Sequence, residues 1–352
     1  MKSYLDLVPQ YEKVHRKQSK MSRICIILAV FLVAVMFGLA DMYLQGITQK
    51  VMQENGDWHY QITSIDTKTS DLIAARPEVE VSGWHSTISA DAGYSISGQP
   101  IAISGLDEDV FGEIYLASLA EGKYPNAANE IAVSSVLKES NDLDLGSVID
   151  LTCPDGSTVS FSIVGFFDNP EKARLIAGSE QSVILAQEGF TTFISASNSP
   201  ASEKYIIQLS QHCDMSSTIE KIKSQYSLSD GQIEANMNLL NIEGQLAGKT
   251  GVNQIYSIAL ILSITVMLTC ILMISSTLNS NVTQRTEFFG MLRCLGATKK
   301  QIMNFVRLEG LYWCKTAIPA GVALSIVVVW VTSAAMRKIS PQWFAYTCAL
   351  PI

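Results

Sequence analysis

Charged residues are scarce in this sequence of 352 residues. They make up 16% of the chain, whereas hydrophobic residues make up 48%. A soluble globular domain carries about 25% charged residues, so the shortage predicts long stretches without charge. Three stretches in which charge is nearly absent occur, at 24–44, 255–278 and 311–336, and their charged residues are Asp41 and Lys315. Each is long enough to cross a bilayer core as a helix, which takes about 20 apolar residues. The sequence therefore predicts an α-helical membrane protein with three transmembrane helices, in contact with the lipid bilayer.

An excess of basic residues is also missing. The chain has 25 Lys and Arg against 33 Asp and Glu, a net charge of −8. A general nucleic-acid-binding protein would present a basic surface. The composition therefore argues against nucleic acid as a partner.

Cysteine patterns that would indicate a metal site or a disulfide framework are absent from the sequence. Of the seven cysteines, Cys25, Cys270 and Cys314 lie inside apolar stretches, and only Cys153 and Cys213 lie in the large polar middle of the chain. A disulfide framework would need several paired cysteines in a short exported chain. We therefore favour free thiols, with a single bridge between Cys153 and Cys213 as the less favoured alternative.

Catalytic and nucleotide-binding motifs are lacking as well. The histidines form no HExxH pattern, and no GxSxG nucleophile motif occurs. The segment Gly248-Lys249-Thr250 resembles the end of a phosphate-binding loop, but position 243, where that motif needs its first glycine, is Glu243. The sequence predicts that the chain is not an enzyme and has no catalytic, cofactor-binding or metal site.

Two weaker patterns have a structural and a functional interpretation. The dipeptides Trp58-His59 and Trp84-His85 lie on predicted strands and could line one ligand surface, although ordinary strand packing is the commoner role of such residues. The segment His212-Cys213-Asp214 could supply metal ligands, but no second cluster completes a site.

The distribution of basic residues predicts how the chain crosses the membrane. Segment 1–23 carries six Lys or Arg against two acidic residues, and segment 279–310 carries five against two. Loops rich in Lys and Arg stay on the cytoplasmic side. We therefore predict a multi-pass plasma-membrane protein with 1–23 and 279–310 in the cytoplasm, and with 45–254 and 337–352 outside.

The predicted exterior segment is acidic. Residues 45–250 include 28 acidic and 11 basic side chains, a net charge of −17. Such a field would attract a cationic ligand, although exported domains are also acidic simply because charge keeps them soluble. We favour the second explanation.

Strand and helix patterns predict an α+β exterior domain of two lobes. Two strand–helix–strand units lie at its ends, at 58–65, 67–75 and 79–88, and at 205–209, 216–226 and 231–236. Together they would form one composite lobe. The middle is rich in β patterns, including a hairpin of 147–153 and 158–166 around the turn Pro154-Asp155-Gly156. It would form a second, β-rich lobe.

The segment between the second and third apolar stretches predicts a short amphipathic helix. Phe288, Met291, Leu292 and Leu295 recur at helical spacing. Gly296 fits a helix C-terminus, and Ala297-Thr298 fit the start of the next helix. A basic helix of this kind can lie on the membrane surface or fit a groove in a partner protein. The residues alone leave both roles open.

Several motifs in the sequence resemble one family. The first motif consists of Arg285 and Glu287, the run Gly290, Met291, Leu292, Arg293, Cys294, Leu295, Gly296, Ala297 and Thr298, and then Gln301, Ile302 and Glu309. It resembles the cytoplasmic motif of FtsX-like, or MacB-type, ABC transporter permeases. Cys294 replaces the commoner alanine. In the exterior segment, residues 121–125, 129–133 and 145–149 resemble the periplasmic core pattern of that family.

The resemblance implies a type VII ABC exporter fold, with a MacB-core-like domain inserted between transmembrane helices one and two. It also implies a coupling helix that contacts a separate cytoplasmic ABC ATPase, which would hold the ATP and Mg, and a second permease module or dimer. The residues expected at this contact are Arg285, Glu287, Phe288, Gly290, Met291, Leu292, Arg293, Leu295, Gly296, Ala297 and Thr298. Since the family unit has four transmembrane helices and a fourth would begin where this sequence stops, we expect an N-terminal part of a larger permease.

Two functions follow from the resemblance. The leading hypothesis is a permease subunit that couples ATP hydrolysis to motion of the exterior domain and exports or extracts amphipathic cargo, such as a peptide, an antibiotic or a lipid-linked molecule. The alternative is a signalling or regulatory subunit that transports nothing and instead controls an exterior enzyme or senses antimicrobial peptides. A membrane-anchored enzyme is disfavoured by the missing motifs. The sequence does not name the cargo.

Overall fold

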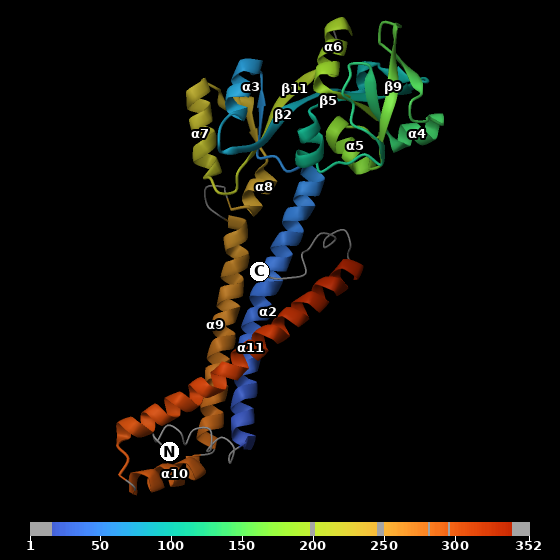
Figure 1. Ribbon diagram of the computed structural model, residues 1–352. Coiled ribbons are helices and arrows are strands. Elements are labelled where there is room, and N and C mark those ends of the chain that lie inside the picture. Colours follow the sequence, from blue (N-terminus) through green and yellow to red (C-terminus); the bar gives the residue numbers. More distant parts are fainter. Residues whose placement is uncertain (1–15, 198–200, 245–249, 281, 295, 340–352) are drawn as a thin grey trace. The chain divides into compact units, whose positions relative to one another are not determined.

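The computed structural model describes residues 16–197, 201–244, 250–280, 282–294 and 296–339 (Figure 1). The chain divides into two compact units. The helical unit consists of Met1–Ile47 and Val252–Ile352, and the sheet unit consists of Thr48–Gly251. Helix α2 (Arg16–Asn55) contributes its last two turns to the sheet unit and its earlier part to the helical unit.

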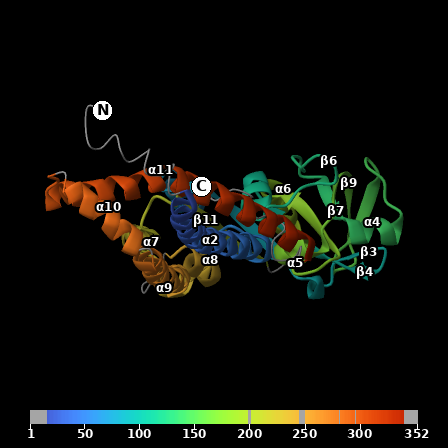
Figure 2. The same cartoon turned by 90° about the horizontal axis from the view of Figure 1, so that it is seen from below.

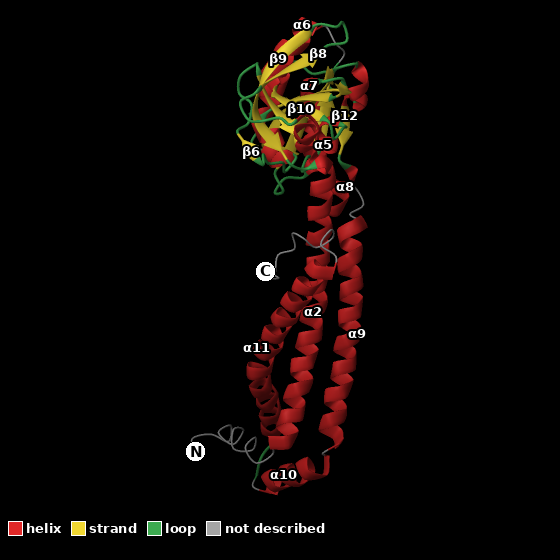
Figure 3. Ribbon diagram, turned by 90° about the vertical axis from the view of Figure 1, so that its right-hand side faces the viewer, coloured by secondary structure: helices red, strands yellow, loops and turns green. Residues whose placement is uncertain are grey.

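The helical unit contains the three predicted membrane spans. The apolar stretches at 24–44, 255–278 and 311–336 lie inside helices α2, α9 (Thr250–Ser280) and α11 (Lys299–Ile339). These three helices are long and apolar enough to cross a membrane. The shorter helix α10 (Val282–Cys294) lies between α9 and α11 in the chain, at one end of the helical unit (Figure 3).

Small residues bring α2 and α11 into close contact. The buried residues of α11 recur at every fourth position: Phe305, Glu309, Trp313, Ala317, Gly321, Ser325, Val329 and Ser333. A Cβ atom added at Gly321 would lie 2.9 Å from the Ile27 carbonyl oxygen on α2, and one added at Gly38 would lie 2.9 Å from Val329. Glycines at both contacts therefore allow the two backbones to approach, as in other membrane helix pairs.

A polar contact joins α2 to α9. The Tyr256 hydroxyl donates a hydrogen bond to an Asp41 carboxylate oxygen at 3.4 Å, and the Gln45 amide donates to the other Asp41 oxygen at 2.9 Å. Most of the remaining surface of α9 is exposed. Among its described side chains only Ala259 and Ser263 are buried.

Within the described residues of the sheet unit, twelve strands form one continuous sheet. Their order is β12-β1-β11-β2-β5-β10-β7-β9-β8-β3-β4, with β6 paired to β9. The strands are β1 (Tyr60–Thr63), β2 (Val79–Ile88), β3 (Ser95–Ile96), β4 (Gln99–Pro100), β5 (Ala102–Leu106), β6 (Glu121–Gly122), β7 (Glu130–Ser134), β8 (Val148–Thr152), β9 (Thr158–Phe167), β10 (Ser182–Ala186), β11 (Ser202–Leu209) and β12 (Ile233–Ala235). The helices are α3 (Thr67–Ala74), α4 (Ser135–Asn141), α5 (Pro170–Ala177), α6 (Gln187–Ser197), α7 (Met215–Tyr226) and α8 (Met237–Ile242), with short turns η2 (Ala90–Ala92), η3 (Val110–Ile114) and η4 (Asp230–Gln232).

The composite lobe forms as the sequence predicts, because the two distant strand–helix–strand units pair with each other. Strand β1 lies between β11 and β12, and β11 also pairs with β2, all antiparallel. Helices α3 and α7, labelled in Figure 1, supply Ile73 and Ile219 to a core that includes Tyr60, Ile62 and Ile207. This order, with both helices contributing to one core, is that of a split β-α-β lobe.

The β-rich lobe contains the predicted hairpin. Strands β8 and β9 pair antiparallel, and Gly156 takes a φ of 84° in the turn between them. Two pairings in this lobe are parallel, β7 with β9 and β5 with β10. Figure 2 labels β7 and β9 in this lobe. Strand β2 pairs with β5 and thereby continues the sheet from one lobe into the other. The sequence patterns did not predict this continuity, because pairing between distant strands leaves no local signal.

Two predicted strands are shorter than expected. The first is Tyr60–Thr63 rather than 58–65, and the Trp58 and His59 side chains before it bond to Asn55 and Glu243. The last is limited to Ile233–Ala235, since η4 forms the turn before it and Asn236 caps α8 after it.

Candidate functional site

Helix α10 carries seven of the eleven predicted coupling residues, and the other four follow its end at Cys294. Among those whose side chains the structure describes, Met291 is 57% exposed, Gly290 and Arg293 are exposed, and Leu292 is half-buried. The side chains of Arg285, Glu287 and Phe288 are outside the described part of the structure, although these residues lie within α10. Leu295 is outside the described residues.

One contact shows how α10 packs against its own unit. The Phe289 ring meets the Phe305 ring of α11 edge-on, with the ring centroids 6.5 Å apart. Met291 is two positions later and therefore lies about 200° further around the helix. The Met291 face thus points away from the contact with Phe305, which explains its exposure. Phe289 was not among the residues expected at the site.

The second half of the motif ends one helix and starts another. Gly296 takes a φ of 92°, its N–H donates to the Arg293 carbonyl, and the Ala297 N–H donates to the Leu292 carbonyl. These two bonds form the glycine C-cap that ends many helices. The helix stop predicted at Gly296 is therefore confirmed.

The following residues cap α11. The Thr298 backbone N–H donates to the Gln301 side chain at 2.8 Å, and the Gln301 N–H donates to the Thr298 hydroxyl at 3.3 Å. This reciprocal pair is a capping box. The predicted start of the next helix is confirmed, and Gly296, Ala297, Thr298 and Gln301 accordingly have a structural role. Glu309 lies in the buried stripe of α11.

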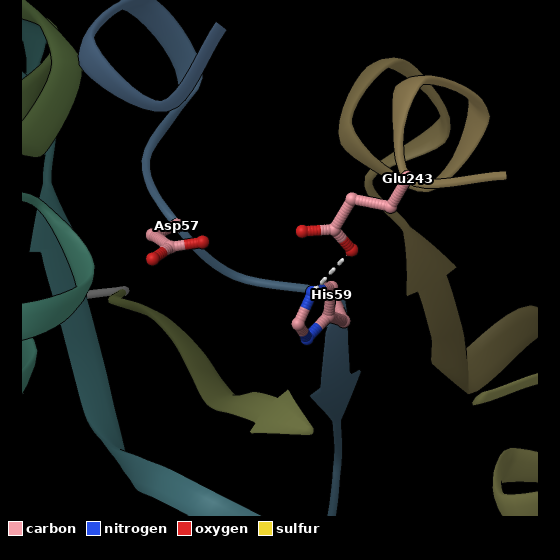
Figure 4. Close-up of side chains that lie close together, drawn as sticks. All are labelled: Asp57, His59 and Glu243. Atoms are coloured by element: carbon pink, nitrogen blue, oxygen red, sulfur yellow. Dashed lines mark hydrogen bonds and ion pairs between the residues drawn. The ribbon is translucent and has the colours of Figure 1, made fainter. Parts of the chain in front are cut away.

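A buried polar cluster lies in the sheet unit. The ligand-type atoms of Asp57, His59 and Glu243 all lie within 4.8 Å of one another (Figure 4). Asp57 and His59 follow the end of α2, and Glu243 follows α8. Within the described residues this is the one group of His, Cys, Asp and Glu that could offer three ligands to a metal ion. The sequence reasoning missed it, because its members are far apart in the chain.

The hydrogen bonds of His59 argue against a metal ion there. The Leu209 backbone N–H donates to His59 Nδ1 at 2.8 Å, so Nδ1 must be the unprotonated nitrogen of a neutral ring. The proton is then on Nε2, 3.0 Å from Glu243 Oε2, and is donated to that carboxylate. A metal ion needs an unprotonated nitrogen, and a metal-bound His usually donates its other N–H to an acceptor. His59 instead meets a donor, so the geometry favours a structural hydrogen bond.

Asp57 sits in an unfavourable place for a carboxylate. Burial raises its pKa, the nearby Glu243 raises it further, and the hydrogen bond from Gln208 acts in the opposite direction. The Gln208 amide donates to Asp57 Oδ2 at 2.8 Å. The cluster thus holds two carboxylates around one imidazole in a partly buried site.

The sheet unit also contains a cleft of about 800 Å³, a size common for ligand sites. Its lining comes from the sheet, from the end of α5 and from the start of α8, and includes Trp58, Gln61, His85, Lys204 and Asn238. Two basic residues in the lining are already paired, Arg174 with Glu180 and Lys204 with Glu234. The cleft therefore does not present free positive charge.

Both histidines of the repeated dipeptides are buried within the fold. Burial lowers the pKa of His85 to about 4, so the ring is neutral. His85 Nε2 donates to the Ile176 carbonyl at 2.9 Å, and the Tyr115 hydroxyl donates to Nδ1 at 2.7 Å. Since His59 is also buried and bonded on both nitrogens, the packing interpretation holds for both. Trp58 and His85 nevertheless line the same cleft.

The remaining sequence candidates have local roles or lie outside the described residues. Cys153 packs in the core of the β-rich lobe, whereas Cys213 lies against the core of the composite lobe, and both are free. Asp214 caps α7 by accepting a bond from Ser217. Gly248 and Lys249 are outside the described residues, and the element before them is helix α8 rather than the strand that precedes a phosphate-binding loop.

Comparison with known families identifies this architecture. The family model described as the MacB-like periplasmic core domain matches residues 22–225, more than half of the chain, and the model described as the FtsX-like permease C-terminal matches residues 260–352. This chain belongs to the FtsX-like, MacB-type ABC transporter permease family. Permease chains of this family are generally not catalytic, and the family normally works with a cytoplasmic ABC ATPase. The permease has a periplasmic-type α/β domain inserted after its first apolar helix.

Solved structures similar to this permease include two exterior domains and one further permease domain. The periplasmic region of MacB from Actinobacillus actinomycetemcomitans matches with 8% identity and a TM-score of 0.40, covering 57% of this chain and 99% of that one. The extracellular domain of YknZ, a noncanonic ABC-type transporter from Gram-positive bacteria, matches with 8% identity and a TM-score of 0.36, covering 50% and 98%. A domain of a putative permease from Porphyromonas gingivalis matches with 10% identity and a TM-score of 0.35, covering 52% and 87%. No curated protein sequence matches the chain.

Proposed function

We propose that this chain is the permease subunit of an ABC transporter and that α10 is its coupling helix to a separate ATPase. The observation that carries the proposal is the exposed face of α10. Phe289 packs against α11, whereas Met291 is 57% exposed on another face of the same helix. A helix held on one side and apolar on the other fits a partner's groove. The family to which the chain belongs supports an ATPase as that partner.

The orientation that we propose places α10 and the N-terminus in the cytoplasm and the sheet unit outside. The basic residues of 1–23 and 279–310 support it. So does the match of 22–225 to a periplasmic core domain. ATP and Mg belong to the partner ATPase in this proposal, and the chain itself catalyses no reaction.

The transported molecule in this proposal is amphipathic, such as a peptide, an antibiotic or a lipid-linked molecule. The ATPase would drive a movement of the apolar helices. This movement would reach the sheet unit through the last turns of α2, which belong to that unit. The open surface of α9, with exposed Leu260, Leu268 and Leu272, supports contacts with lipid and with a second permease module or dimer.

The test compares two methionines with the same exposure. Met291 and Met237 are both 57% exposed, but Met291 lies on α10 and Met237 lies in the sheet unit. Met291→Asp would place an unpaired carboxylate in the ATPase groove, which costs several kcal/mol. We therefore expect Met291→Asp to lose most of the ATPase that copurifies with wild type in mild detergent, and Met237→Asp to retain it.

The experiment uses the full chain co-expressed with its proposed partner ABC ATPase. Equal recovery of the ATPase with Met291→Asp and with wild type, at equal levels of folded permease, would reject α10 as the coupling contact.

A further inference from the structure

The C-terminal end of α2 is held by one side chain that follows it directly and by two from distant parts of the sheet unit. The last carbonyls of a helix have no partner within the helix and must find one elsewhere. The Asn55 carbonyl accepts from the Trp58 indole N–H at 2.7 Å, and the Gln53 carbonyl accepts from Lys172 Nζ at 2.9 Å. The next carbonyl along the chain, that of Gly56, accepts from the Asn236 amide at 3.3 Å.

Lys172 joins three segments at one point. It lies on α5, and its Nζ donates to the Gln53 carbonyl on α2 and, at 2.6 Å, to the Tyr115 carbonyl directly after η3. The residue is 5% exposed. None of its described partners is a carboxylate, so these carbonyls take the place of a counter-charge. Tyr115 belongs to the core between the two lobes, together with Ile176 of α5.

The position of Lys172 is not explained by its own helix. It is the third residue of α5, where the positive end of the helix dipole disfavours a cation, and Glu171 beside it has the charge expected there. Burial also lowers the pKa of Lys172 to about 8, whereas Glu171 raises it. The dipole of α5 and the burial therefore both oppose a cation here, and the Glu171 carboxylate favours it. The compensating contact is with the C-terminal end of α2, where the helix dipole favours positive charge.

We propose that Lys172 is a positioning residue that fixes the end of α2 to α5 and η3, so that movement of α2 is passed into the sheet unit. This inference rests on the proposed function, in which the ATPase moves the membrane helices. Helix α2 contains the first apolar span and would therefore carry that movement. Without Lys172 the α2 end would keep the contacts of Trp58 and Asn236 but lose its link to the core between the lobes.

Hydrogen–deuterium exchange of the full chain in detergent tests the anchor. Lys172→Met keeps the side-chain length and removes the donors. We expect exchange protection of residues 48–59 to fall about tenfold, the scale of a lost hydrogen bond from a charged group. Protection of β2, residues 79–88, should not change. Lys172→Arg, which keeps charge and donors, should restore most of the protection, and Lys221→Met on the exposed face of α7 should have no effect.

A second measurement separates transmission from simple stability. With the ATPase bound, ATP and vanadate should change exchange in residues 170–186 of wild type. In Lys172→Met the change should be lost from 170–186 while ATPase recovery stays the same. A side chain that merely stabilised the fold would leave this nucleotide response in place.

The outcomes that overturn the inference are specific. Unchanged exchange protection of residues 48–59 in Lys172→Met would overturn it. An equal loss of protection in residues 48–59 and 79–88 would overturn it as well, because Lys172 would then have no specific effect on the end of α2. If the Met variant does not fold, Lys172→Gln, with a neutral donor on a shorter stem, provides the same comparison. Failure of the ATPase to bind wild type would instead count against the proposed function.

Discussion

His59 Nε2 and Glu243 Oε2 lie 3.0 Å apart, although 184 positions separate the two residues in the chain. His59 follows α2, where the chain enters the sheet unit, and Glu243 follows α8, shortly before the chain leaves it. The Asn236 N–H also donates to the His59 carbonyl at 2.9 Å. The two connecting segments of the sheet unit are therefore bonded to each other within that unit.

This contact predicts different effects for two substitutions of Glu243. Glu243→Gln keeps an oxygen that accepts the His59 Nε2–H, so stability should stay close to wild type. Glu243→Leu leaves that buried N–H without an acceptor, which costs about 1–3 kcal/mol. Thermal unfolding of the full chain in detergent measures the difference. The control is Glu234→Leu, since Glu234 is 66% exposed. Equal melting temperatures for the Leu and Gln variants of Glu243 would contradict the assignment of the bond.

Asp57 predicts a pH dependence. Its pKa is raised in the folded chain, mainly by burial, so the folded state binds the proton more tightly than the unfolded state. The stability contributed by this group is present at low pH and is lost as pH rises through the raised pKa. Asp57→Asn should therefore stabilise the protein at pH 7, because the amide still accepts from Gln208 and carries no charge. The gain in melting temperature should shrink as pH falls toward the ordinary range of an aspartate. A gain independent of pH would refute this origin.

The approach of α2 and α11 predicts a specific sensitivity to a single methyl group. At Gly321 a Cβ would lie 2.9 Å from the Ile27 carbonyl oxygen, whereas at Gly310 on the same helix nothing lies within 4 Å. Gly321→Ala should destabilise the helical unit by about 1–3 kcal/mol, the usual cost of overpacking. Gly310→Ala should be neutral or slightly stabilising, since Ala favours a helix. Melting temperatures in detergent compare the two, and equal values would show that the close approach has no energetic importance.

The proposed orientation predicts which sites a membrane-impermeant thiol reagent reaches in intact cells. Glu139→Cys, on the exposed surface of α4, should be labelled, and Lys299→Cys, at the start of α11, should be labelled only after the cells are opened. Both variants need a chain without its native cysteines, since Cys294 is exposed close to Lys299. Labelling of Lys299→Cys alone in intact cells would reverse the topology.

Local patterns were enough to predict several elements. The helix over 67–75 and the strand over 79–88 match α3 and β2 closely. The turn at Pro154-Asp155-Gly156 marked the β8–β9 hairpin, because residues near in sequence determine a hairpin. The end of one helix at Gly296 and the start of the next at Thr298 could be predicted for the same reason, since residues near in sequence form both caps. Trp58 and His59 were assigned wrongly to a strand, because their bonds to Asn55 and Glu243 have no local signature.

The sequence by itself determined the three apolar helices, the acidic inserted domain and the family motif on α10, because each depends on composition or on spacing within a short segment. Only the tertiary structure decided that one sheet runs through both lobes, that Asp57, His59 and Glu243 meet, and that Lys172 caps α2. These three features depend on contacts between elements that are far apart in the chain. Burial and hydrogen bonds between those elements stabilise the contacts. The spacing of hydrophobic residues in the sequence does not indicate which elements will contact each other.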